Sequence, residues 1–248
     1  MKTKLKKLVI DEFSGKDVQE LYIQKAEDGL WKSEEKLIDR YFKKRGKVLD
    51  IGCGTGRTTI ALVKKRYKVI GIDIVPKMIE NAKKIAKKKK LKIHYRVMDA
   101  CNLNFKDKTF YYALFSNQGW TQIPGKENRF LALKETYRVL KKEGVYIFSA
   151  HIRQYSLKWL PLWSWMWFKL YILKSLGFKI DELDFGDRFF GREMSGAKFK
   201  TKQYIHVGSV KEASRQLNDS GFQILSIGKG VSEQSGTKPT FFVCRKRG

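Results

Sequence analysis

The segment of this 248-residue sequence with the clearest chemistry is Val48–Gly56, which reads VLDIGCGTG. An apolar strand pattern runs directly into three alternating glycines and then into a helical pattern. Glycines at such a place let the backbone turn sharply and let a ligand lie against bare main chain at the helix N-terminus. The segment therefore predicts a site for a nucleoside-bearing ligand.

The spacing of these glycines differs from the G-x-G-x-x-G pattern, in which the helix N-terminus receives a pyrophosphate. An acid, Asp50, precedes the glycines, and a carboxylate beside the ligand favours a cationic or amine-bearing group over a phosphate. A second acid, Asp73, ends the next predicted strand, 21 residues after Gly52. An acid there can accept hydrogen bonds from both hydroxyls of a ribose.

The elements that must position these residues alternate between strand and helix from residue 47 to 151. Continuous apolar strands that alternate with helices indicate a parallel sheet covered on both faces. The predicted strands cover 47–51, 68–72, 91–98, 109–116 and 145–150, and the predicted helices cover 56–66, 76–88 and 127–141. After residue 205 the pattern resumes with a helix over 209–220 and strands over 222–227 and 240–245.

We interpret residues 1–248 as one domain with four parts. Residues 1–46 form a helical segment, 47–151 a cofactor-binding core, and 206–248 a final helix and two strands. Residues 152–205 fit no strand–helix unit, and we interpret them as an insertion that carries a substrate lid.

Four motifs, in order, identify the core with a known family. Val48–Gly56, Ile70–Ile74 (IGIDI), Met98–Ala100 (MDA) and Tyr137–Phe148 (YRVLKKEGVYIF) together resemble the class I S-adenosylmethionine-dependent methyltransferases. The resemblance implies a Rossmann-like α/β fold: a seven-stranded, mostly parallel sheet with helices on both faces and the last strand antiparallel. It places the lid insertion between strand 5 and the following helix. It also implies S-adenosyl-L-methionine as cofactor and methyl transfer as the reaction.

Carried over position by position, the resemblance also implies site residues. It assigns the methionine part of the cofactor to Asp50, Gly52, Cys53, Gly54 and Gly56, the ribose to Asp73, the adenine to Asp99 and Ala100, and the surroundings of the methyl group to Asn117 and Gln118. The alternative for Asp50 and Asp73 is a cap on the adjacent helix, and for Asp99 and Asn117 a role in a turn.

Candidate catalytic and substrate residues lie further along the chain. His151 follows the fifth strand and is our candidate general base, because histidine titrates near neutral pH; packing or capping is the alternative. We expect Trp31, Gln118 and Arg188 to contact the acceptor, with Arg188 in a mobile, anion-contacting loop over 186–192. No carboxylate and histidine cluster has a spacing that indicates a metal.

Four of the six tryptophans fall in Leu157–Leu176, within the insertion. Lysines and a proline interrupt this segment, so it is not predicted to span a membrane. Three interpretations stay open: a lid over the substrate pocket, a peripheral membrane contact, and a stacking surface for exposed bases.

The composition limits the partners and the compartment. The net charge of +27 invites a nucleic-acid or anionic-membrane partner, while 42% hydrophobic residues exclude disorder for most of the chain. The densest basic run, Lys83–Lys92, suits a solvated helix end or a phosphate contact. Three cysteines without a CxxC pair, and an N-terminal apolar stretch too short for a signal peptide, predict a cytoplasmic protein.

We therefore expect methyl transfer to a small-molecule or lipid-like acceptor. The alternatives are methylation of tRNA or rRNA, and a non-catalytic factor that binds S-adenosylmethionine.

Overall fold

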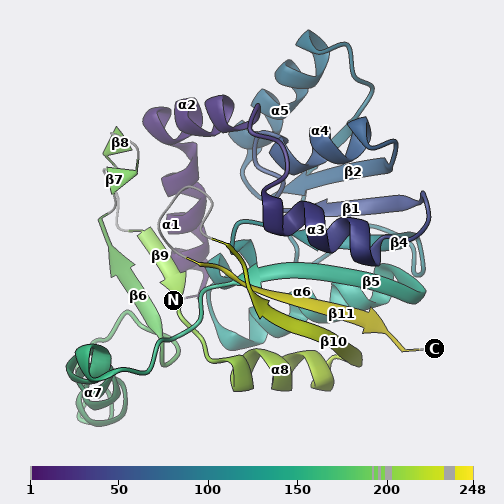
Figure 1. Ribbon diagram of the computed structural model, residues 1–248. Coiled ribbons are helices and arrows are strands. Elements are labelled where there is room, and N and C mark those ends of the chain that lie inside the picture. Colours follow the sequence, from purple (N-terminus) through teal and green to yellow (C-terminus); the bar gives the residue numbers. More distant parts are fainter. Residues whose placement is uncertain (1, 192, 195–196, 199–202, 232–237, 248) are drawn as a thin grey trace.

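A central seven-stranded sheet organises the chain (Figure 1). The computed structural model describes residues 2–191, 193–194, 197–198, 203–231 and 238–247. The sheet has the strand order β10-β11-β5-β4-β1-β2-β3. Its strands are β1 (Lys47–Ile51), β2 (Lys68–Asp73), β3 (His94–Val97), β4 (Phe110–Phe115), β5 (Leu140–Ala150), β10 (Phe222–Lys229) and β11 (Thr240–Lys246).

Strands β1 to β5 run parallel to one another, whereas β11 lies antiparallel between β5 and β10. The predicted mostly parallel sheet with an antiparallel last strand is therefore confirmed. Several boundaries differ from the sequence prediction, and the strand expected over 145–150 begins earlier, at Leu140. The helix expected over 127–141 ends at Val139, because the chain is already extended at Leu140, which pairs with Phe110. The strand expected over 91–98 shortens to β3.

Both faces of the sheet are buried, which explains its uninterrupted apolar strands. Successive strand residues point to opposite faces, so Val48 and Leu49 enter different cores. Leu49 packs with Leu133 of α6 (Lys126–Val139) and Leu217 of α8 (Val210–Asp219). Val48 packs with helices α3 (Lys32–Tyr41) and α4 (Arg57–Lys64) on the other face. Helix α5 (Pro76–Lys88) packs along β2 and β3.

The N-terminal helices α1 (Lys2–Ser14) and α2 (Lys16–Lys25) lie across the edge where the parallel strands end (Figure 1). Leu5, Val9 and Phe13 of α1 share a buried cluster with Met78 of α5 and Tyr204 of β9 (Gln203–His206). This packing holds α1 and α2 over the carboxyl ends of the strands.

The insertion contains a helical part and a small sheet. The helical part comprises η2 (Leu157–Trp159), α7 (Leu160–Phe168) and a π-helical turn, η3 (Lys169–Leu173). Strand β6 (Asp187–Phe190) pairs antiparallel with β9, and β7 (Glu193–Met194) pairs with β8 (Ala197–Lys198). The loop predicted over 186–192 is therefore a strand at 187–190, and Arg192 lies outside the described residues. In the described part of the chain, no helix has the length and apolar character that crossing a membrane requires.

Candidate active site

A cavity opens at the carboxyl ends of β1, β2 and β4, beside the point where the strand order reverses. Ligands of open α/β sheets bind at this place. Side chains of α1 and α2 cover the cavity: Lys6, Val9, Phe13 and Tyr22. Among the described residues no side chain of the insertion lines it, and the lid stays a prediction. The packing of the N-terminal helices on α5 and β9 holds them over the cavity.

The predicted glycine loop adopts a backbone that only glycine accepts without strain. Gly52, Gly54 and Gly56 have φ angles of +61°, +54° and +100°. A Cβ atom on Gly52 would lie 2.5 Å from the ring of Phe115. Gly52 and Gly54 line the cavity, whereas Gly56 precedes the first turn of α4. The loop therefore presents bare main chain to the cavity.

Cys53 turns away from this surface. Its thiol is buried among Ile79, Ala82 and Tyr95, and burial raises the pKa of the thiol well above its usual value. A buried, protonated thiol packs as a small apolar side chain.

Asp73 ends β2 and faces the cavity, and it also holds the glycine loop. Its Oδ2 accepts a hydrogen bond from the Gly54 amide and its Oδ1 one from the Val75 amide, both at 2.9 Å. Burial raises the pKa of this carboxyl to about 6, although the two amide donors oppose the shift. Asp73 thus has two roles: it fixes the backbone of the glycine loop, and it presents a carboxyl group to the cavity.

Asp50 does not line the cavity. Its side chain is fully buried, and its Oδ2 accepts hydrogen bonds from the hydroxyls of Thr58 at 2.6 Å and Thr59 at 2.5 Å, in the first turn of α4. Burial raises the pKa of Asp50 to about 6. These bonds anchor α4 beneath the glycine loop through two of its side chains, and no side chain that the structure describes caps the backbone amides at the start of α4.

Asp99, which follows β3, lines the cavity with Met98, Ala100 and Cys101. Its Oδ2 lies 2.5 Å from the Lys6 ammonium and its Oδ1 accepts a hydrogen bond from the Cys101 amide at 2.9 Å. Burial alone would raise the pKa of Asp99, but these donors outweigh it and lower the pKa. Sequence reasoning missed Lys6, because no spacing relates it to an acid 93 residues away.

Asn117 and Gln118 follow β4, and only Asn117 reaches the cavity. Both adopt left-handed backbone conformations, with φ angles of 49° and 53°. Asn117 lines the cavity, and its amide donates a hydrogen bond to the Tyr22 hydroxyl at 3.2 Å. Gln118 is buried outside the cavity lining; its backbone amide bonds Ser149, and the chain continues into the short helix η1 (Gly119–Gln122).

The other three predicted residues, Trp31, His151 and Arg188, are not brought to the cavity. His151 follows β5, and its carbonyl accepts a hydrogen bond from the Gly208 amide at 3.2 Å. Arg188 lies in β6, opposite Ile205. The sequence signals for these three were residue type and position along the chain, neither of which fixes where a side chain points. The cavity wall at this edge is supplied by α1, α2 and η1.

Trp31 stacks on the Arg57 guanidinium, 4.3 Å from the ring centre. Arg57 pairs with the fully buried Glu34 at 2.7 Å and donates to the Ser116 hydroxyl at 3.0 Å. Ser116 in turn donates to Glu34. This buried group braces the turn that carries Asn117 into the cavity.

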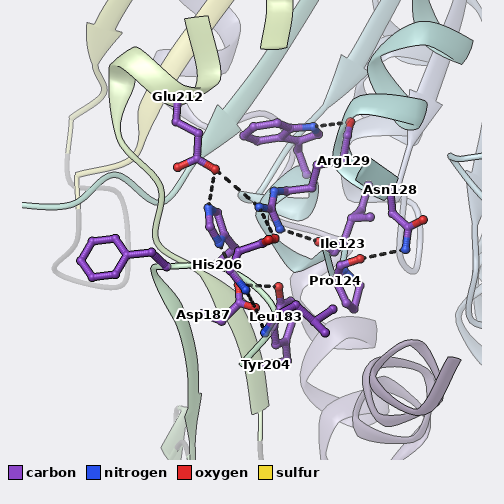
Figure 2. A network of polar contacts seen from close by, with 12 residues as sticks. Ile123, Pro124, Asn128, Arg129, Leu183, Asp187, Tyr204, His206 and Glu212 are labelled. Carbon is purple, nitrogen blue, oxygen red and sulfur yellow. Dashed lines mark hydrogen bonds and ion pairs between the residues drawn. The ribbon is translucent and has the colours of Figure 1, made fainter. Parts of the chain in front are cut away.

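A charge network lies behind the cavity rim formed by Ile123, Pro124 and Asn128 (Figure 2). Arg129 is fully buried and lies 3.0 Å from Asp184 and 3.5 Å from Glu212. His206 bridges Asp187 at 2.8 Å and Glu212 at 2.9 Å. Burial would raise the pKa of Glu212, but His206, Arg129 and Arg153 outweigh it and lower the pKa to about 2.

Three members of this network, Asp184, Asp187 and His206, place candidate metal ligand atoms within 4.8 Å of one another. The sequence did not indicate this group, because its members come from β6, β9 and the loop before β6, up to 22 positions apart. The Arg129 guanidinium already neutralises Asp184, so ion pairing explains the arrangement.

The comparisons with known proteins agree with this geometry. A family model described as a methyltransferase domain matches residues 48–144. The ubiquinone biosynthesis O-methyltransferase of Pelagibacter ubique is 35% identical over 135 residues, which cover 50% of this chain and 54% of that protein. The demethylmenaquinone methyltransferase of Lactiplantibacillus plantarum is 30% identical over 183 residues, or 71% of this chain and 70% of that protein.

Among solved structures, a SAM-dependent methyltransferase from Methanosarcina mazei superposes with a TM-score of 0.70 at 25% identity, covering 88% of this chain and 99% of that one. Against the Pelagibacter relative, in contrast, the chain spans only about half of the curated protein's length.

Proposed function

This chain belongs to the class I S-adenosylmethionine-dependent methyltransferases, and on that premise we propose that it methylates a small acceptor with an aromatic or quinone-like ring. The observation that carries the proposal is the cavity where the glycine loop, Asp73 and Asp99 meet beneath an apolar roof. The curated relatives support the acceptor class, since their names refer to ubiquinone biosynthesis and to demethylmenaquinone.

The residues of the cavity fit S-adenosylmethionine. Gly52 and Gly54 leave a main-chain surface with no side chain, and Asp73 presents a buried carboxylate beside it. Ile74 and Met98 add apolar walls near Asp99. We assign the ribose hydroxyls to Asp73 and the adenine to the Met98–Cys101 side, with the methionine end toward the glycine loop and Asn117.

The cofactor supplies a methyl group on a positively charged sulfur, which makes that carbon electrophilic. The protein's task in such an in-line transfer is to align the acceptor and exclude water. Phe13 and Val9 form an apolar cover, and the hydrogen-bonded pair of Tyr22 and Asn117 lies at the wall by the end of β4. We propose that Tyr22 and Asn117 orient the polar group of the acceptor.

Lys6 holds the position that we assign to the adenine amine, because it pairs directly with Asp99. Binding of the cofactor then requires the Lys6 ammonium to move away from Asp99 Oδ2, so that this oxygen can accept a hydrogen bond from the adenine amine. The Lys6 side chain is 43% exposed, so it can turn to solvent at little cost.

Methyl-labelled S-adenosylmethionine provides the test. The protein is incubated with the label and with separated lipid, small-molecule, RNA and protein fractions of a cell extract, and then with a hydroxylated benzoquinol and a naphthoquinol. We expect label in the lipid or small-molecule fraction and in at least one quinol. Label confined to RNA or protein would contradict the acceptor class, and the Asp73→Asn variant serves as the low-affinity control.

A further inference from the structure

A second surface lies away from the cavity, on residues 155–180, which we call the tryptophan arm. Its helix α7 stands apart from the central sheet, on the side of the molecule away from α4 and α5 (Figure 1). Only Met166 of α7 is buried. Leu157 is 88% exposed, Leu176 68%, Trp165 54% and Trp167 52%. A helix that is apolar on all sides is normally buried in a protein core or in a membrane, so this surface calls for an apolar partner.

The arm is held firmly at its base. The Arg153 guanidinium lies 4.7 Å from the Phe185 ring centre and donates to the Phe185 carbonyl at 3.0 Å. The Trp163 indole donates to the Gln154 carbonyl at 3.2 Å, and Lys169 pairs with Glu182 at 2.8 Å. The apolar side chains therefore project from a folded element attached to the body.

The charge of the arm indicates the chemistry of the partner. Residues 155–180 include four lysines and no Asp or Glu. Lys158, Lys174 and Lys179 are exposed, among exposed aromatic rings. Tryptophan and tyrosine favour the boundary between lipid headgroups and acyl chains, and lysines near it are attracted to anionic lipids.

We propose that the tryptophan arm docks the protein onto an anionic membrane surface, with α7 lying in the interface. The nine residues of α7 are too few to cross a bilayer, which requires about 20. A second copy of the chain is a poorer occupant, because it would bring four lysines against four lysines without an acid between them. The proposal stands on this surface alone and holds for any acceptor.

The first experiment measures binding of the full chain to vesicles. Phosphatidylcholine vesicles with about 30% phosphatidylglycerol are compared with pure phosphatidylcholine by co-sedimentation, at low and high salt. We expect binding to the anionic vesicles that weakens with salt. We also expect a blue shift of tryptophan emission, and quenching by lipids brominated on the acyl chain, as Trp165 and Trp167 leave water.

Matched variants assign the binding to the arm. Trp165→Ser/Trp167→Ser is compared with Val97→Ser/Leu131→Ser, whose side chains are exposed to a similar extent on β3 and α6. The arm variant should bind anionic vesicles at least about tenfold more weakly, while the control variant binds as the wild type does. Unchanged far-UV circular dichroism and unchanged cofactor affinity show that both variants are folded.

A second pair separates the arm from the general positive charge. Lys174→Gln/Lys179→Gln removes charge from the arm, and Lys83→Gln/Lys87→Gln removes the same charge from α5. A larger loss for the arm pair supports the proposal, and equal losses overturn it.

Three further outcomes overturn the proposal. The first is a wild-type protein that binds neither kind of vesicle. The second is an arm variant that binds as the wild type does. The third is concentration-dependent self-association in gel filtration that the arm variant abolishes while vesicle binding is absent. None of these measurements requires the acceptor or methyl transfer.

Discussion

Replacement of Asp73 by asparagine tests the cofactor assignment most directly. Alanine is the less informative change, because Asp73 also accepts hydrogen bonds from the amides of Gly54 and Val75. Removing both acceptors would leave two buried donors without partners, at a cost of about 1–3 kcal/mol each, and would disturb the loop itself. Asparagine keeps the size of the side chain and one carbonyl oxygen, so Asp73→Asn removes the negative charge and one of the two acceptors, while one backbone amide keeps its hydrogen bond.

The expected loss of affinity follows from the hydrogen bonds to the ribose. A hydrogen bond to a charged group is worth about 1.5–3 kcal/mol, against about 0.5–1.5 kcal/mol for a neutral pair. With two hydroxyls, the loss of the charge weakens binding by roughly 2–3 kcal/mol, or roughly 30- to 150-fold in Kd. Calorimetric titration with the demethylated cofactor product measures this directly.

The pH dependence adds a second readout. Burial raises the pKa of Asp73 to about 6, so the carboxyl is protonated below that pH and accepts hydrogen bonds less well. Wild-type affinity should therefore fall by up to about tenfold per pH unit below pH 6. The Asp73→Asn variant should lack the part of this dependence that comes from Asp73. Asp50 also has a raised pKa of about 6, but it does not face the cavity.

The stability contribution of Asp73 changes in the opposite direction. Its pKa is higher in the folded than in the unfolded protein, so the folded state binds the proton more tightly. The Asp73 carboxyl therefore lowers the free energy of unfolding above about pH 6. This loss of stability disappears as the pH falls from 6 toward about 4, the pKa of the carboxyl in the unfolded protein. Affinity and this stability term thus respond to acid with opposite signs.

Two results would refute the reasoning. One is an Asp73→Asn affinity within about threefold of the wild type. The other is a wild-type affinity that does not change between about pH 7.5 and 5. Asp107→Asn, at an exposed ion pair with Arg138, is the control and should change neither quantity.

Two further predictions concern the loop and the buried network. Gly52→Ala should lower cofactor affinity more than tenfold, on the order of 1.4 kcal/mol or more, because its Cβ atom would meet a phenyl ring of β4 at 2.5 Å. Gly29→Ala has a similar φ angle of +71° with open space around it, so equal losses in the two variants would refute this explanation. Glu212→Gln should lower the free energy of unfolding at neutral pH by about 3 kcal/mol, since it leaves His206 and two arginines without their shared carboxylate. The pKa of Glu212 is lowered to about 2, so its stabilisation is complete above about pH 4.5 and is lost as the pH falls toward 2; chemical denaturation at several pH values measures it, with the exposed Glu143→Gln as control.

The amino-acid sequence by itself determined the core of the fold and which strand ends meet at the cavity that we assign to the cofactor. Alternating apolar strands and helices specify a parallel sheet, and the carboxyl ends of parallel strands meet at one edge. For that reason Gly52, Gly54 and Asp73, each at or just after a strand end, could be placed together from their positions, and the family resemblance added Asp99 and Asn117. These inferences depend on backbone geometry, which short-range patterns encode.

The tertiary structure alone decided which side chains face the cavity and which elements cover it. Asp50 also lies near the end of a strand, yet its carboxylate accepts hydrogen bonds from two threonines in the first turn of α4 and does not face the cavity. The roof comes from α1 and α2, through Lys6 and Tyr22, because these helices pack on α5 and β9 while the tryptophan arm projects from the body. Side-chain rotamers, and contacts between residues about 100 positions apart, depend on how whole elements pack. The periodicity and spacing of residues in the sequence do not specify that packing.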